Sequence, residues 1–137
     1  MTDAATEAKP PIAAAVIIQE GRVLLVRRRV KEGSLSWQFP AGGVEAGETR
    51  EDAAVRETAE ETGLTVRALR LLGERVHPAT GRTMSYTACE VVEGEARVAD
   101  DDELDSVEWL EHGQLAEYVP YGFYEPVQAY LDETLKR

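Results

Sequence analysis

The chain has 137 residues and a formal charge of −11, from 26 acidic and 15 basic side chains, and this length allows one domain with a buried core. The charge argues against a nucleic-acid polymer or an anionic membrane as a partner, but not against a small phosphate ligand whose charge metal ions balance. The single cysteine excludes an internal disulfide, no apolar run reaches the roughly 18 residues that span a bilayer, and the first residues lack the regions of a signal peptide. We therefore expect a cytoplasmic protein.

The first part of the chain predicts a tail followed by two strands. Residues 1–10 are small and polar, so we expect a disordered tail and a single domain over residues 11–137. Apolar runs of strand length cover 12–19 and 23–26, separated by a turn. The second run leads directly into Arg27–Arg29. These arginines are either solvated charges on a sheet edge or include a guanidinium that contacts a ligand phosphate.

A loop rich in glycine comes next. The aromatic segment Trp37–Pro40 leads into Ala41, Gly42 and Gly43, and Gly47 follows four residues later. Glycine lets the backbone approach a ligand closely or adopt a positive φ. The composition of this loop therefore indicates a backbone of defined shape that leads to a candidate ligand site.

Capping residues predict a helix directly after this loop. Thr49, with Asp52 three residues later, resembles a short capping box at the start of the helix. Gly63 is suited to end it, which gives a helix of about 13 residues. We expect one face of this helix to pack on the core through Val55, Ala59 and Thr62.

Three glutamates near the end of the predicted helix indicate a metal site. Glu57, Glu60 and Glu61 fall within an arc of about 100° on one face. Glu57 and Glu61 repel each other as an i, i+4 pair, and the last turn is the negative end of the helix dipole. A divalent cation relieves both effects, and clustered carboxylates suit Mg²⁺ or Mn²⁺. The alternative is a solvated acidic face, but the glycines before the helix favour the metal site.

The same stretch resembles the signature of the Nudix hydrolases. That signature is a Gly, five residues, a Glu, seven residues, and then Arg-Glu-aliphatic-x-Glu-Glu-x-Gly-aliphatic. The chain matches it at Gly42, Glu48, Arg56, Glu57, Glu60, Glu61, Gly63 and Leu64. Thr58 stands where the family usually has an aliphatic residue; because Thr is close to Val in shape, we expect a tolerated packing change. The resemblance implies an α/β (α+β) fold with a mixed β-sheet sandwiched between α-helices.

The second half of the chain predicts three more strands and a C-terminal helix. The strand-like runs cover 67–76, 83–92 and 104–110, and Gly73 is a candidate bulge. Residues 118–135 predict a helix after Pro120, with Pro126 as an alternative first-turn residue. His77, in the loop between two of the strands, is either a ligand contact or a surface histidine without a role, and the second case is the more common.

The resemblance also implies roles for the acidic residues. Glu57, Glu60 and Glu61 would bind Mg²⁺, or Mn²⁺, together with the backbone carbonyl of Ala41. Glu48 would either steady the loop or add a further ligand. These assignments require the carboxylates to face a common point.

A second set of roles concerns catalysis and phosphate binding. Glu103 lies ahead of a Trp-containing strand, where Nudix members carry a metal ligand or general base, and Glu57 and Glu60 are alternative bases. Arg56 would orient the carboxylates, since Glu60 lies four residues after it. Arg28 matches a basic residue that phosphate-binding members carry.

The implied activity is hydrolysis of a P–O–P bond in a nucleoside diphosphate linked to a group X. Tyr124 replaces the base-reading Asn of a subfamily that acts on oxidised dGTP, which leaves a nucleoside triphosphate as the favoured substrate and its oxidised form open. Pro78 lies near a proline of the ADP-ribose subfamily, so ADP-ribose or another nucleotide sugar is the alternative. A third reading is a non-catalytic nucleotide sensor. The candidate substrate contacts are Arg28, Gly42, Gly43, His77 and Tyr124.

We therefore expect a small-molecule nucleotide as the partner of this domain. The sequence leaves open whether the chain works as a monomer or as a homodimer.

Overall fold

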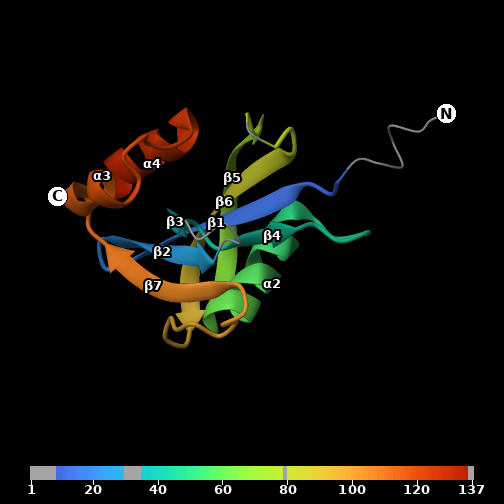
Figure 1. The fold of residues 1–137 in the computed structure, drawn as a ribbon, viewed down its shortest axis with the longest axis horizontal. Coiled ribbons are helices and arrows are strands. Elements are labelled where there is room, and N and C mark those ends of the chain that lie inside the picture. The colour runs from blue at the N-terminus through green and yellow to red at the C-terminus, as the bar shows by residue number, and fades with distance from the viewer. Residues whose placement is uncertain (1–8, 30–34, 79, 136–137) are drawn as a thin grey trace.

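One seven-stranded mixed sheet organises the molecule, and helices cover both of its faces (Figure 1). The computed structural model describes residues 9–29, 35–78 and 80–135. The main strand order is β3-β2-β1-β6-β5, with β4 paired to β1 and β7 paired to β2. The strands are β1 (Ile12–Gln19), β2 (Arg22–Arg29), β3 (Leu35–Gln38), β4 (Ala41–Gly43), β5 (Thr65–Val76), β6 (Thr83–Glu93) and β7 (Leu104–Leu110). The helices are α2 (Arg50–Thr62), the 3-10 turn η1 (His112–Gln114), α3 (Leu115–Tyr118) and α4 (Glu125–Leu135).

Strand β1 is buried on both faces, which explains its uninterrupted apolar sequence. The odd-numbered residues 13–17 belong to the core cluster that contains Ala53 and Ala54 of α2. Ala14 and Val16 point the other way, into the cluster that contains Val127 of α4. Side chains alternate between the faces of a strand, so one short run of residues holds both helical layers. The expected fold, a mixed sheet between helices, is confirmed.

Helix α2 begins and ends where the capping residues predict. The Thr49 side chain accepts the backbone N–H of Asp52 at 3.0 Å, and Gly63 adopts the left-handed conformation with φ 79°. Thr58 is fully buried, and its hydroxyl donates to the Ala54 carbonyl at 2.8 Å. Its packing on the core agrees with the expectation of a tolerated substitution.

The packing face of α2 differs from the prediction at one residue. Ala59 is exposed, whereas Thr62 is buried and Val55 is half-buried against the core. Small residues and Glu61 pack against the sheet, so the buried face of α2 is rotated away from Ala59. The buried residues of α2 are Ala53, Ala54, Thr58, Glu61 and Thr62.

The C-terminal region contains two helices, and the helix that we predicted after Pro120 begins only at Glu125. Helix α3 ends at Tyr118, and α4 begins at Glu125. Pro126 therefore lies in the first turn of α4, which is the alternative start that the sequence indicates. The break follows from Pro120, which disfavours helical backbone at Val119. Val119 has φ −132° and ψ 75°, and Gly122 has a positive φ of 82°.

Strand β5 is irregular, and its register with β6 shifts in three places. One shift lies between Leu71 and Gly73, which confirms the predicted bulge. A Cβ on Gly73 would lie 3.0 Å from the Tyr124 hydroxyl oxygen. The glycine therefore makes room for a side chain from the start of α4.

The predicted tail lies outside the described residues except for Lys9 and Pro10. The Pro10 carbonyl accepts two N–H groups of Arg82, at 3.1 and 2.8 Å. In the described part of the chain, no helix has the length and apolarity needed to cross a membrane.

Candidate active site

The glycine loop packs directly against the end of α2 and forms the floor of the candidate site. The Ala41 backbone N–H donates to Glu61 Oε1 at 3.3 Å. A Cβ on Gly42 would lie 2.1 Å from the carboxyl carbon of Glu57, so a residue with a side chain cannot occupy this position without displacing Glu57. Strand β4 and α2 thus bring backbone and carboxylates together, as the sequence predicts.

Arg56 holds this arrangement from the side through four partners. Its guanidinium donates to both oxygens of Glu48, at 2.8 and 2.9 Å, and to Glu57 at 2.9 Å. It also donates to the Gly43 carbonyl at 2.9 Å and reaches Glu60 at 3.4 Å. A planar guanidinium suits such multiple contacts. The geometry supports the predicted orienting role of Arg56.

Glu48 is held in its ionised form by these contacts. The hydrogen bond from Arg56, followed by that from the Glu45 backbone N–H, lowers the pKa of Glu48 to about 2. The same pair raises the pKa of Arg56. Both oxygens of Glu48 already have partners within the loop, so the arrangement favours the loop-steadying role over that of a metal ligand.

Glu57 and Glu61 form a buried carboxylate pair. Their side chains are 14% and 5% exposed. Burial is the main cause that raises the pKa of Glu61 to about 8, against the opposing charge of Arg28. Burial also raises the pKa of Glu57, against the lowering effect of Arg56. Two buried acids that resist ionisation form a donor set that a divalent cation stabilises, and their hard oxygens fit Mg²⁺ or Mn²⁺.

Glu60 lies apart from this pair. Its side chain is 57% exposed and extends toward Arg56. Among the described residues, no group of three acidic, histidine or cysteine side chains is arranged to hold a metal ion. The three glutamates lie at the predicted positions along α2, but two of their carboxylates already pair with arginines. Arg56 contacts Glu57, and Arg28 contacts Glu61 at 3.7 Å.

Arg28 links Glu61 to Glu103, which comes from the segment before β7. The guanidinium of Arg28 forms an ion pair with each of these acids. The Glu103 carbonyl also accepts the Arg29 backbone N–H at 2.8 Å, which fixes this segment to the end of β2. Glu103 thus lies at the edge of the site, and Arg28 already has two carboxylate partners.

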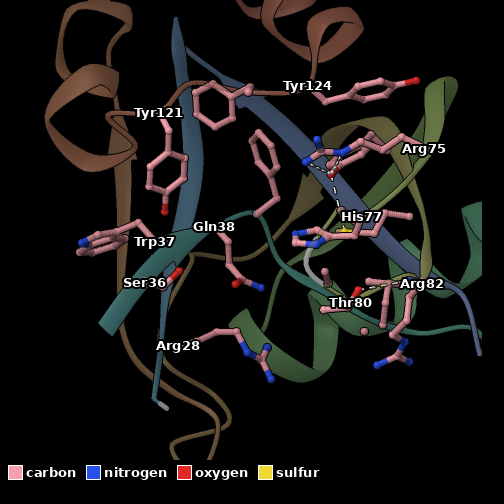
Figure 2. Close-up of a pocket in the computed structure, with 18 of the residues that line it drawn as sticks. Arg28, Ser36, Trp37, Gln38, Arg75, His77, Thr80, Arg82, Tyr121 and Tyr124 are labelled. Atoms are coloured by element: carbon pink, nitrogen blue, oxygen red, sulfur yellow. Dashed lines mark hydrogen bonds between the residues drawn. The ribbon is translucent and has the colours of Figure 1, made fainter. Parts of the chain in front are cut away.

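A cavity of about 440 Å³ opens beside the carboxylates (Figure 2). Arg28, Ala41 and Gly42 line it, as do His77 and Tyr124. Gly43 is not among the described residues that line it; its carbonyl is bound by Arg56. The volume falls in the range of ligand pockets.

The Tyr124 hydroxyl is already engaged, because it donates to the Glu74 carbonyl at 2.6 Å. The Tyr124 ring lies against that of Tyr86, with 5.4 Å between centroids. Tyr124 therefore lines the cavity with its hydroxyl engaged and with its ring packed against Tyr86 and under the Arg75 guanidinium.

Several lining residues were not predicted from the sequence. They comprise aromatic rings and two further arginines from separate strands and loops: Trp37, Phe39, Arg75, Arg82 and Tyr86. Tyr121 and Phe123 also line the cavity; the sequence indicates them either as base-stacking residues or, as the preferred alternative, as core residues. One signal in the sequence could have indicated part of this set. Residues 75 and 77, and residues 82, 84 and 86, are spaced two apart at the facing ends of two predicted strands and in the turn between them.

Comparison with known proteins agrees with this geometry. A family model described as NUDIX domain matches residues 9–130. A putative nudix hydrolase 1 from Caenorhabditis elegans is 35% identical over 102 residues, which is 72% of this chain and 28% of that protein. An RNA pyrophosphohydrolase from Caulobacter vibrioides is 46% identical over 65 residues, which is 47% of this chain and 37% of the relative.

The fold also agrees with that of a solved structure. A MutT NUDIX hydrolase from Burkholderia pseudomallei superposes with a TM-score of 0.65 at 25% identity, covering 95% of this chain and 100% of the other. By contrast, the aligned region spans well under half the length of the two curated relatives.

Proposed function

Because this chain belongs to the Nudix hydrolase family, we propose that it hydrolyses the P–O–P bond of a nucleoside diphosphate linked to a group X, in the presence of Mg²⁺. The observation that carries this proposal is a cavity of nucleotide size whose floor, at Ala41 and Gly42, adjoins the buried pair Glu57 and Glu61. The cavity would hold the nucleoside, and the carboxylate end would hold the diphosphate.

The metal would be held by Glu57, Glu61 and the Ala41 carbonyl, and Glu60, which extends toward Arg56 in this structure, would have to turn to join them. When bound, the ion supplies positive charge to the phosphoryl oxygens and to the leaving group. Arg56 keeps Glu57 and the loop in position through its hydrogen bonds to Glu48 and Gly43. This scaffold limits the reorganisation that the reaction needs.

Glu103 is the candidate general base that the geometry favours over Glu57. Its side chain is 49% exposed, so water reaches it, and Arg28 ties it to the site. Glu57 is hydrogen-bonded to Arg56 and nearly buried, which suits a ligand better than a proton acceptor. Glu60 is exposed and is the second candidate.

A nucleoside triphosphate, cleaved to the monophosphate and pyrophosphate, is the first substrate candidate. Tyr124 lines the cavity, but its hydroxyl proton is engaged by the Glu74 carbonyl and is not free to read an oxidised guanine. ADP-ribose is the second candidate. RNA enters as a third candidate, because a relative bears the name RNA pyrophosphohydrolase.

One assay tests the proposal against the non-catalytic alternative. The protein is incubated with Mg²⁺ and a panel of nucleoside triphosphates, ADP-ribose and nucleotide sugars, and the released monophosphate, pyrophosphate and sugar phosphate are measured. We expect turnover that EDTA abolishes and that Glu61→Gln lowers by at least about 100-fold. Glu111→Gln, on an exposed side chain paired with Arg22, is the matched control. Binding without any product would contradict the proposal.

A further inference from the structure

One wall of the cavity is formed by Arg75, His77 and Arg82, at the tip of the β5–β6 hairpin. Arg75 pairs with Met84 across the hairpin, and the His77 backbone N–H donates to the Arg82 carbonyl at 2.8 Å. Arg75 and His77 are two residues apart, so they share one face of the hairpin. Figure 2 shows both pointing into the cavity, with Arg82 beyond His77.

Among the described residues, Arg75 and Arg82 have no acidic partner, although the chain has a net charge of −11. Six other arginines form ion pairs with carboxylates: Arg22, Arg27, Arg28, Arg50, Arg56 and Arg67. Within the part of the chain that the structure describes, the Arg75 guanidinium contacts a tyrosine hydroxyl and a tyrosine ring, and that of Arg82 contacts the Pro10 carbonyl, with no carboxylate at either guanidinium. Positive charge is therefore available at this wall.

Arg75 is held in place by aromatic residues rather than by an acid. Its Nε and Nη2 atoms both donate to the Tyr86 hydroxyl at 3.3 Å. Its guanidinium also lies over the Tyr124 ring, 5.3 Å from the centroid, while Glu74 fixes the Tyr124 hydroxyl. Of the five N–H donors of an arginine, these contacts use two. The remaining donors are held in position for an acceptor in the cavity.

Two strands separate the backbone of this wall from the glycine loop beside the carboxylate pair. The register runs from Gly43 to Ile12, from Ile12 to Met84, and from Met84 to Arg75. These are three strand spacings, or about 14 Å between the Gly43 and Arg75 backbones. This separation leaves room for a group at Arg75 that differs from a diphosphate held beside Glu57 and Glu61.

We propose that Arg75, with Arg82 at the rim, binds a second phosphate on the nucleoside part of the substrate. The inference rests on the proposed function and narrows it to nucleotides that carry a further phosphate on the ribose, of which the 3′ ester is the form tested below. A guanidinium fork matches the geometry and charge of such a group. The phosphate is either a terminal monoester or the diester that joins a second nucleotide.

Calorimetric titration with compounds that lack a P–O–P bond tests this inference without turnover. The probes are adenosine 5′-monophosphate, adenosine 3′,5′-bisphosphate and the dinucleotide pApA, with the guanosine forms in parallel. We expect wild-type protein to bind the bisphosphate at least about tenfold more tightly than the monophosphate. Equal or tighter binding of pApA would identify the diester as the source, and weaker binding would identify the monoester.

Variants assign the preference to Arg75. Arg75→Gln should abolish the tenfold ratio and leave monophosphate affinity within about threefold, and Arg82→Gln should reduce the ratio. Arg70→Gln is the matched control, because Arg70 lies on the same strand over the Tyr130 ring, 5.4 Å from its centroid, and does not line the cavity. This control should retain the ratio. Circular dichroism confirms that each variant is folded.

Two results would overturn the inference. One is a wild-type ratio near one for every base; the other is an Arg75→Gln variant that weakens both ligands equally, which would place Arg75 against the shared part of the nucleotide. If either occurs while the panel assay still shows Mg²⁺-dependent cleavage, the proposed hydrolase function stands. If the ratio holds but no P–O–P compound is cleaved, the hydrolase proposal fails and the phosphate site remains.

Discussion

Gly42 and Glu57 are in such close contact that a methyl group on Gly42 would lie 2.1 to 2.4 Å from all three atoms of the Glu57 carboxyl group. Position 42 requires a glycine, because a Cβ at this residue would overlap the Glu57 side chain of α2. The position of a candidate metal ligand thus depends on the absence of a side chain on the neighbouring strand.

Gly42→Ala should therefore displace Glu57. We expect kcat/KM for the cleaved nucleotide to fall by about 100-fold or more, because a shift of about 1 Å in a positioned group costs that much. Gly113→Ala is the matched control, since a Cβ at Gly113 meets no atom within 4 Å. Unchanged activity in Gly42→Ala, measured beside this control, would show that Glu57 tolerates displacement.

Arg56 gives a second prediction, because it contacts two carboxylates and a carbonyl at once. Arg56→Gln should lower the free energy of unfolding by about 1–3 kcal/mol, the range for hydrogen bonds to charged groups, and should lower kcat/KM by about 100-fold. Arg56→Lys should restore little activity, since an ammonium cannot replace a planar fork. Denaturant unfolding and steady-state kinetics measure the two effects. A fully active lysine variant would exclude the orienting role.

The sequence predicts the parts of this site that depend on neighbouring residues in the chain. The ends of α2 follow from Thr49 and Gly63, which act on their own helix termini. The wall formed by Arg75 needs information from distant segments, because three register shifts in β5 decide which side chains face the cavity. The exposed position of Glu60 likewise depends on where Arg56 and the loop settle.

Metal binding should be visible in stability as well as in activity. Mg²⁺ at about 100 times its dissociation constant should stabilise the wild-type protein by about 2.7 kcal/mol, which raises Tm by roughly 8–11 °C for a domain of this size. Glu61→Gln removes a candidate ligand and should lose most of that rise. Glu111→Gln should keep it. Thermal unfolding with and without Mg²⁺ provides the measurement, and an equal rise in all three proteins would count against the assigned ligands.

The buried thiol of Cys89 should be unreactive in the folded protein. Burial raises the pKa of Cys89 from 9.0 to about 12, and the thiolate is the reactive form. At pH 8 the thiolate is therefore about a thousandfold scarcer than in the unfolded chain, because three pKa units separate the two states. Labelling by an aromatic disulfide reagent should be at least about 100-fold slower in buffer than in guanidinium chloride. Rapid labelling in buffer would indicate that β6 opens readily.

Thr58 provides the last prediction, because it is the one position where the chain departs from the Nudix signature. Its hydroxyl donates to the Ala54 carbonyl at 2.8 Å inside the core, but a carbonyl within a helix also accepts a backbone N–H. Thr58→Val therefore leaves no polar group without a partner and adds an apolar methyl group. We expect the free energy of unfolding to change by less than about 1 kcal/mol, with kcat/KM unchanged. Thr58→Ala leaves a cavity instead and should cost about 1–2 kcal/mol. A valine variant as unstable as the alanine variant would mean that the hydroxyl, rather than the volume of the side chain, holds α2 against the sheet.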